Sequence, residues 1–120
     1  MRALTPTLRF DPQALAAAAG IRACIFDVDG VLTDGTLYIS EAGETLKAFH
    51  ALDGHGLKLL AQGGITPIVI TGRDSPAVRR RLKDLGVVHA VFGAHDKLAA
   101  AEPLMAQMGL SWPEMAAMGD

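Results

Sequence analysis

Residues 23–35 read ACIFDVDGVLTDG and are the most informative part of the sequence. Four apolar residues stand directly before the acids Asp27 and Asp29, a pattern typical of a buried parallel strand with polar groups at its end. Gly30 allows the chain to turn sharply after the second acid. Because residues two apart on a strand share a face, we expect the carboxylates of Asp27 and Asp29 to point into one pocket.

Segments with strand and helix patterns alternate along the rest of the chain. The patterns predict a short N-terminal helix at 11–20, strands at 23–26, 66–70, 87–92 and 115–118, and helices at 56–62, 76–85 and 97–108. Residues 36–49 are expected to form a β-hairpin flap, with extended runs at 37–40 and 45–49 around a turn at 41–44. The alternation predicts an α/β fold, a Rossmann-like parallel sheet with helices on both faces. The length of 120 residues suits a single domain.

Composition and charge narrow the classes of partner. The net charge of −2 offers no basic surface for nucleic acid and no attraction to an acidic membrane. No apolar run approaches the roughly 20 residues that cross a bilayer. Cys24 is the only cysteine, so no internal disulfide can form, and we expect a cytoplasmic protein.

Polar residues follow each predicted strand, at the sheet edge where ligands bind in such folds. Asp27 and Asp29 follow the first strand, Thr71-Gly72 the second, Lys97 the third and Asp120 the fourth. Two close carboxylates favour a bound cation, and magnesium prefers oxygen ligands of this kind. Asp120 is a candidate third ligand. The hydroxyl of Thr71, the backbone amide of Gly72 and the charge of Lys97 suit a phosphoryl group.

The ordered motifs resemble those of the haloacid dehalogenase superfamily of phosphatases. The matching residues are Asp27-Val28-Asp29, then Thr71, then Lys97, then Gly119-Asp120. The resemblance covers about residues 21–120 and implies one phosphatase domain whose fourth motif lies at the end of the chain. The superfamily often inserts a substrate-closing cap domain at the position of the hairpin, which is too short here to form one.

Further residues resemble the 3-deoxy-D-manno-octulosonate 8-phosphate (KDO 8-phosphate) phosphatases of lipopolysaccharide biosynthesis. They are residues 27–35, the short hairpin, Phe49-His50 before Asp53-Gly54, and residues 71–76. This resemblance implies magnesium-dependent hydrolysis of a sugar-acid phosphate monoester, with an acylneuraminate 9-phosphate as the nearest alternative substrate.

The resemblance also implies a role for each motif. Asp27 attacks phosphorus and becomes an aspartyl-phosphate, which splits one difficult step into two. Asp29 acts as the general acid and then as the general base. Magnesium sits on the Asp27 carboxylate, the Asp29 backbone carbonyl and Asp120. Thr71 and Lys97 hold the phosphoryl oxygens.

A second group of residues is expected to contact the substrate. The resemblance implies this role for Asp29, His50, Asp53, Gly54, Lys58, Gly72, Arg73, Arg81 and Lys97. Helical spacing independently places Arg81 toward the inward face of its helix and Arg80 on the opposite face. The family often carries Val-Arg between this histidine and the Asp-Gly pair. Ala51-Leu52 stand there instead, so one cationic contact is missing.

The hairpin also predicts an oligomer. Its apolar residues Leu37, Ile39, Leu46 and Phe49 need cover, because an isolated hairpin is marginally stable in water. The resemblance implies a homotetramer in which hairpins pack between subunits and help to close each site.

Two other functional classes stay open from the sequence. A signalling receiver domain also uses an acidic pair, a threonine and a lysine, but its phosphorylated aspartate follows the third strand rather than the first. A non-catalytic oligomerisation module is the other alternative.

Overall fold

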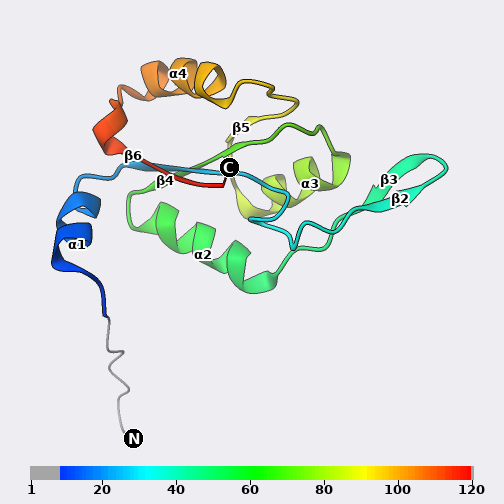
Figure 1. Cartoon of the computed structure of the whole chain (residues 1–120), viewed down its shortest axis with the longest axis horizontal. Coiled ribbons are helices and arrows are strands. Elements are labelled where there is room, and N and C mark those ends of the chain that lie inside the picture. Colours follow the sequence, from blue (N-terminus) through cyan, green and yellow to red (C-terminus); the bar gives the residue numbers. More distant parts are fainter. Residues whose placement is uncertain (1–8, 120) are drawn as a thin grey trace, which may run out of the picture.

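A four-stranded parallel sheet forms the centre of the structure, a computed structural model that describes residues 9–119 (Figure 1). The strand order is β5-β4-β1-β6, and all three pairings are parallel. The strands are β1 (Ala23–Phe26), β4 (Thr66–Ile70), β5 (His89–Val91) and β6 (Met115–Met118). The predicted α/β fold class is confirmed.

Helices cover both faces of this sheet (Figure 1). Helices α2 (Ala51–Gln62) and α3 (Pro76–Leu85) lie on one face, and α4 (Lys97–Met108) lies on the other. Strand side chains alternate between the faces, so the core divides into two clusters. The first contains Phe26, Val28, Leu32, Leu57, Val69, Val78, Leu82 and Val87, and the second contains Ala23, Ile68, Ile70, Ala101 and Met105.

The ends of the helices follow local capping. Asp11 caps α1 (Pro12–Ala18) by accepting a hydrogen bond from the Gln13 amide. Helix α2 begins at Ala51, earlier than the predicted Gly56, because His50 caps it by accepting from the amide of Leu52. None of the helices in the described part of the chain is long and apolar enough to span a bilayer.

Three further features differ from what the sequence suggests. Helix α4 continues through Pro103, although proline in a helix interior usually kinks or breaks the helix. A short 3₁₀ helix, η1 (Trp112–Glu114), precedes β6 and was not predicted. Strand β5 is shorter than the predicted run at 87–92.

The hairpin projects away from the sheet (Figure 1). It consists of β2 (Tyr38–Ser40) and β3 (Gly43–Leu46). The predicted turn at 41–44 is wrong in its second half, because Gly43 and Glu44 already pair with β2. Gly43 has a φ of 99°, which permits the tighter turn. The side chains of Ile39 and Leu46 are 63% and 51% exposed, so nothing in the described chain covers this apolar surface.

Candidate active site

The strand pairings bring three predicted motifs to one edge of the sheet. Phe26, the last residue of β1, lies opposite Val69 of β4 and Met118 of β6. The backbone amide of Asp27 donates to the carbonyl of Met118 at 3.1 Å. A Cβ atom on Gly119 would lie only 2.7 Å from the Cβ of Asp27, so the chain after β6 runs directly against Asp27.

Asp27 contacts Lys97 across this edge. The Lys97 Nζ lies 3.1 Å from Oδ2 of Asp27, while Oδ1 accepts the backbone amide of Val28 at 2.8 Å. The Asp27 side chain is 14% exposed and that of Lys97 is 35% exposed, so both groups are accessible to a small ligand. Lys97 is the first residue of α4, where the helix dipole disfavours a cation. The carboxylate of Asp27 offsets this unfavourable interaction.

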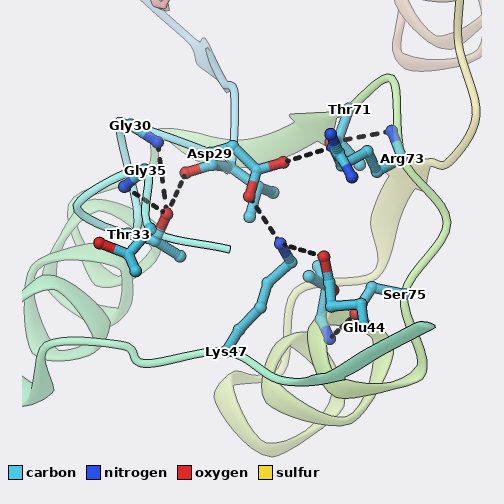
Figure 2. Close-up of polar contacts among 12 residues, drawn as sticks. Asp29, Gly30, Thr33, Gly35, Glu44, Lys47, Thr71, Arg73 and Ser75 are labelled. Carbon is cyan, nitrogen blue, oxygen red and sulfur yellow. Dashed lines mark hydrogen bonds and ion pairs between the residues drawn. The ribbon is translucent and has the colours of Figure 1, made fainter. Parts of the chain in front are cut away.

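Asp29 lies between two cations (Figure 2). Its Oδ1 accepts a hydrogen bond from Lys47 Nζ at 2.6 Å, and its Oδ2 lies 3.7 Å from Nε of Arg73. The side chain of Arg73 is 54% exposed, whereas that of Lys47 is only 1% exposed. Asp29 and Arg73, both predicted substrate contacts, are thus brought together at the edge of the sheet.

Lys47 is a site residue that the sequence did not reveal. It follows β3, and its ammonium also pairs with Oε2 of Glu44 at 3.0 Å (Figure 2). Burial works to lower the pKa of Lys47, but its hydrogen bonds to Asp29 and Glu44 outweigh burial and raise the pKa above its usual value. Lys47 therefore stays charged at neutral pH. Oε1 of Glu44 is buried and has no hydrogen-bond partner within residues 9–119.

Thr71 is buried in the loop that follows β4. Its amide donates to the carbonyl of Val91 at 3.0 Å, and its carbonyl accepts from the amide of Ala94 at 2.9 Å. Its hydroxyl accepts weakly from the amide of Arg73 at 3.5 Å. The next residue, Gly72, is exposed. Backbone bonding on both sides fixes Thr71, and the loop beyond it stays open to ligands.

Two of the cavities that the described residues line contain predicted site residues. One of about 310 Å³ includes Asp27, Lys97 and Gly119 in its wall. The other, of about 540 Å³, includes His50 and Asp53. Within this single chain, the predicted substrate contacts His50 and Asp53 therefore do not share a cavity wall with Asp27. Their contact with a substrate stays a prediction.

The remaining predicted contacts lie on α2 and α3. Arg81 faces inward as predicted. Its guanidinium lies 5.9 Å from the centre of the Phe49 ring and fills the place that a Cβ atom on residue 54 would take, which glycine leaves open. Arg80 faces outward and pairs with Asp84. Lys58 is exposed on α2. Within residues 9–119, Nε of Arg81 is buried without a hydrogen-bond partner.

The oxygen donors at the sheet edge fit a magnesium ion. Asp27 provides a partly exposed carboxylate there, and oxygen is the donor that magnesium prefers. A contribution from the Asp29 backbone carbonyl stays a prediction. No group of three histidine, cysteine or acidic residues converges within the described part of the chain. Asp120, the predicted third ligand, lies outside the described residues.

Comparisons with known proteins agree on one group of relatives. No protein-family model matches the chain. The KDO 8-phosphate phosphatase of Haemophilus influenzae is 45% identical over 100 residues, which are 83% of this chain and 56% of that protein. The chain thus spans little more than half the length of this curated relative.

Solved structures give the same result. The cobalt-bound form of the Haemophilus influenzae phosphatase superposes with a TM-score of 0.83 at 43% identity, over 87% of this chain and 61% of that one. The phosphatase of Moraxella catarrhalis, crystallised with a magnesium ion, a phosphate ion and KDO, superposes with a TM-score of 0.84 at 41% identity. That match covers 90% of this chain and 62% of the other.

Proposed function

We propose that the chain is a magnesium-dependent phosphatase. The proposal follows from its relationship in sequence and fold to the phosphatases of the haloacid dehalogenase superfamily, and to the KDO 8-phosphate phosphatases in particular. We propose as substrate a sugar-acid phosphate monoester, KDO 8-phosphate, cleaved to KDO and phosphate. The observation that carries this proposal is the pairing of Asp27 with Lys97 at the edge of the sheet, 3.1 Å apart. We still expect a cytoplasmic location, because the single cysteine of the sequence cannot form an internal disulfide.

The proposed first step transfers the phosphoryl group to Asp27. A carboxylate oxygen of Asp27 attacks phosphorus while the bond between phosphorus and the sugar oxygen breaks. Asp29, protonated before this step, gives its proton to the departing oxygen. Lys97 and the Thr71 hydroxyl bind the phosphoryl oxygens, and the charge of Lys97 stabilises the negative charge that develops on them.

The second step hydrolyses the aspartyl-phosphate. Asp29, now ionised, takes a proton from a water molecule whose oxygen attacks phosphorus. The bond between phosphorus and Asp27 breaks, which releases phosphate and restores both carboxyl groups. Magnesium, held by Asp27, the Asp29 carbonyl and Asp120, would offset the negative charge around the phosphoryl group when bound.

We expect the chain to release phosphate from KDO 8-phosphate only when magnesium is present. Three carboxyl-bearing residues around one phosphate would repel it without a cation, so chelation by EDTA should stop phosphate release and added magnesium should restore it. The measurement is colourimetric detection of phosphate, with an acylneuraminate 9-phosphate assayed in parallel. Equal phosphate release with and without chelator would contradict the metal requirement. No release from either sugar phosphate would contradict the proposed substrate class.

We further propose that the chain forms a homotetramer with hairpins packed between subunits. Support comes from the exposed apolar side chains of Tyr38, Ile39 and Leu46 on a hairpin that stands away from its own core. Sedimentation at micromolar concentration should then give a species of four chains. Replacing Ile39 and Leu46 together by Ser should shift it toward smaller species, because the association loses its apolar contact. A monomer for the unaltered chain would contradict the proposal.

A further inference from the structure

We propose that Arg79 is a positioning residue, which holds the loop after β4 in the place where Arg73 reaches a bound substrate. The inference rests on the proposed function, because it concerns how the site of that reaction keeps one of its expected substrate contacts in place. Arg79 lies on α3, outside the residues expected to contact the substrate. Its role is to act through the loop rather than to touch the reacting atoms.

The loop that carries Arg73 is buried at both ends and exposed between them. Thr71 and Ser75 are only 2% and 5% exposed, whereas residues 72–74 are all exposed. Ser75 is further fixed because its hydroxyl caps α3. The amide of Arg73 makes only a weak contact, at 3.5 Å, with the hydroxyl of Thr71. Gly72 adds backbone freedom, so the middle of the loop needs a further contact to stay in one place.

Arg79 supplies that contact through Asp74. Its Nε donates to Oδ1 of Asp74 at 2.7 Å, and its Nη2 donates to Oδ2 at 2.9 Å. The two bonds engage both carboxylate oxygens, which fixes the direction of the Asp74 side chain as well as its distance. Asp74 directly follows Arg73, so the contact holds the loop next to the residue that is expected to meet the substrate.

The Arg79 guanidinium also lies over an aromatic ring. Its Cζ is 4.1 Å from the centre of the ring of Phe92, which follows β5 and packs against the first core cluster. Half-exposed ion pairs usually contribute little, because two long side chains must be ordered to form them. Here the ring already orders the arginine, since planar guanidinium groups stack on aromatic faces. Arg79 therefore links the loop after β4 to the core.

Arg73 occupies a position suited to an anionic part of the substrate. Its Nε lies 3.7 Å from Oδ2 of Asp29, and its side chain is 54% exposed (Figure 2). A guanidinium carries five N–H donors, more than Asp29 alone can engage, which favours binding of a carboxylate or phosphate oxygen. A shift of the loop by about 1 Å would take these donors out of hydrogen-bond reach of a bound substrate.

The test measures KM and kcat separately for KDO 8-phosphate, with magnesium held constant. Arg79→Lys keeps the positive charge but loses the planar fork and the stacking, so it should raise KM about 5- to 20-fold. The kcat should change by less than about twofold, because Arg73 binds the substrate rather than the bonds that break. A lower kcat at an unchanged KM would mean that fewer chains are folded and active, which overturns the inference.

Arg80→Lys is the matched control. Arg80 lies next to Arg79 on α3 but pairs with Asp84 of the same helix at 3.1 Å, so this variant should change neither KM nor kcat. Asp74→Asn weakens the contact from its other side and should raise KM as Arg79→Lys does, and the double variant should add little. A KM for Arg79→Lys no higher than that for Arg80→Lys would overturn the inference.

A second double variant tests whether Arg79 acts through Arg73. Arg73→Met should itself raise KM, and the addition of Arg79→Lys should then have little further effect. Two losses that simply multiply would mean that Arg79 acts by another route, which also overturns the inference.

Hydrogen exchange supplies a readout that needs no activity. Arg79→Lys and Asp74→Asn should each speed amide exchange in residues 72–74, whereas Arg80→Lys should not. Unchanged exchange in Arg79→Lys would show that Arg79 does not hold the loop. An unaltered chain that hydrolyses no sugar phosphate would instead refute the proposed function, and faster exchange would then confine Arg79 to a structural role.

Discussion

Replacement of Asp27 by Asn abolishes phosphate release in our account, with a loss of at least about 10³-fold in kcat. The amide of asparagine has no negative charge and is a poor nucleophile, so no acyl phosphate can form. The change is nearly isosteric and keeps the side-chain oxygen that accepts the Val28 amide. Steady-state hydrolysis of a sugar phosphate at saturating magnesium measures the effect.

The fold should survive this substitution. Asp27 loses its ion pair with Lys97, but a third of the Lys97 side chain is exposed and can turn to solvent, so we expect a change in unfolding free energy of about 1 kcal/mol or less. Thermal unfolding followed by circular dichroism provides the control. An Asp27→Asn variant that is folded and still turns over near the rate of the unaltered chain would eliminate Asp27 as the nucleophile.

Lys97→Met should have the second large effect, a fall of about 10²- to 10³-fold in kcat/KM. The methionine side chain retains much of the length of lysine but removes the charge that lies 3.1 Å from Asp27. The transferring phosphoryl group then loses a fixed cation. The negative charge of Asp27 is then no longer offset by a cation, which disfavours the approach of a phosphate ester. Kinetics on a sugar phosphate, with magnesium held constant, measure the loss.

A matched lysine separates this effect from a general loss of charge. Lys83→Met removes the same charge from the exposed face of α3, so it should change kcat/KM by less than about twofold. A Lys97→Met variant that behaves like Lys83→Met would show that Lys97 is only a helix-terminal residue paired with an acid. Rescue by raised magnesium alone would assign its role to metal retention rather than to the phosphoryl group.

The sheet and its polar edge could be predicted because both arise from local patterns. Apolar runs of strand length before Asp27 and Thr71 define buried parallel strands, and parallel strands must end at a common edge. That rule predicts Lys97 at the same edge as Asp27, although the two residues are far apart in the sequence. The inward direction of Arg81 likewise follows from helical spacing alone.

The position of Lys47 could not be predicted, because it depends on how the hairpin packs against the rest of the chain, and no local sequence pattern encodes that packing. A lysine near a turn is usually solvated, so nothing in the sequence distinguished Lys47, although it is more deeply buried than Lys97. Its position depends on the path of the chain from β3 back to the sheet. The early start of α2 was missed for a related reason, because His50 acts as an uncommon cap through its ring nitrogen.

The most direct test of the account is to trap the covalent intermediate. In an Asp29→Asn variant, water lacks its general base, while p-nitrophenyl phosphate can still transfer its phosphoryl group without an acid. After incubation with this ester and magnesium followed by an acid quench, mass spectrometry of the digested chain should find one phosphoryl group on the peptide that contains Asp27. A phosphoryl group on any other residue, or ester turnover by the unaltered chain with Asp27 unmodified in every quenched sample, would contradict the account.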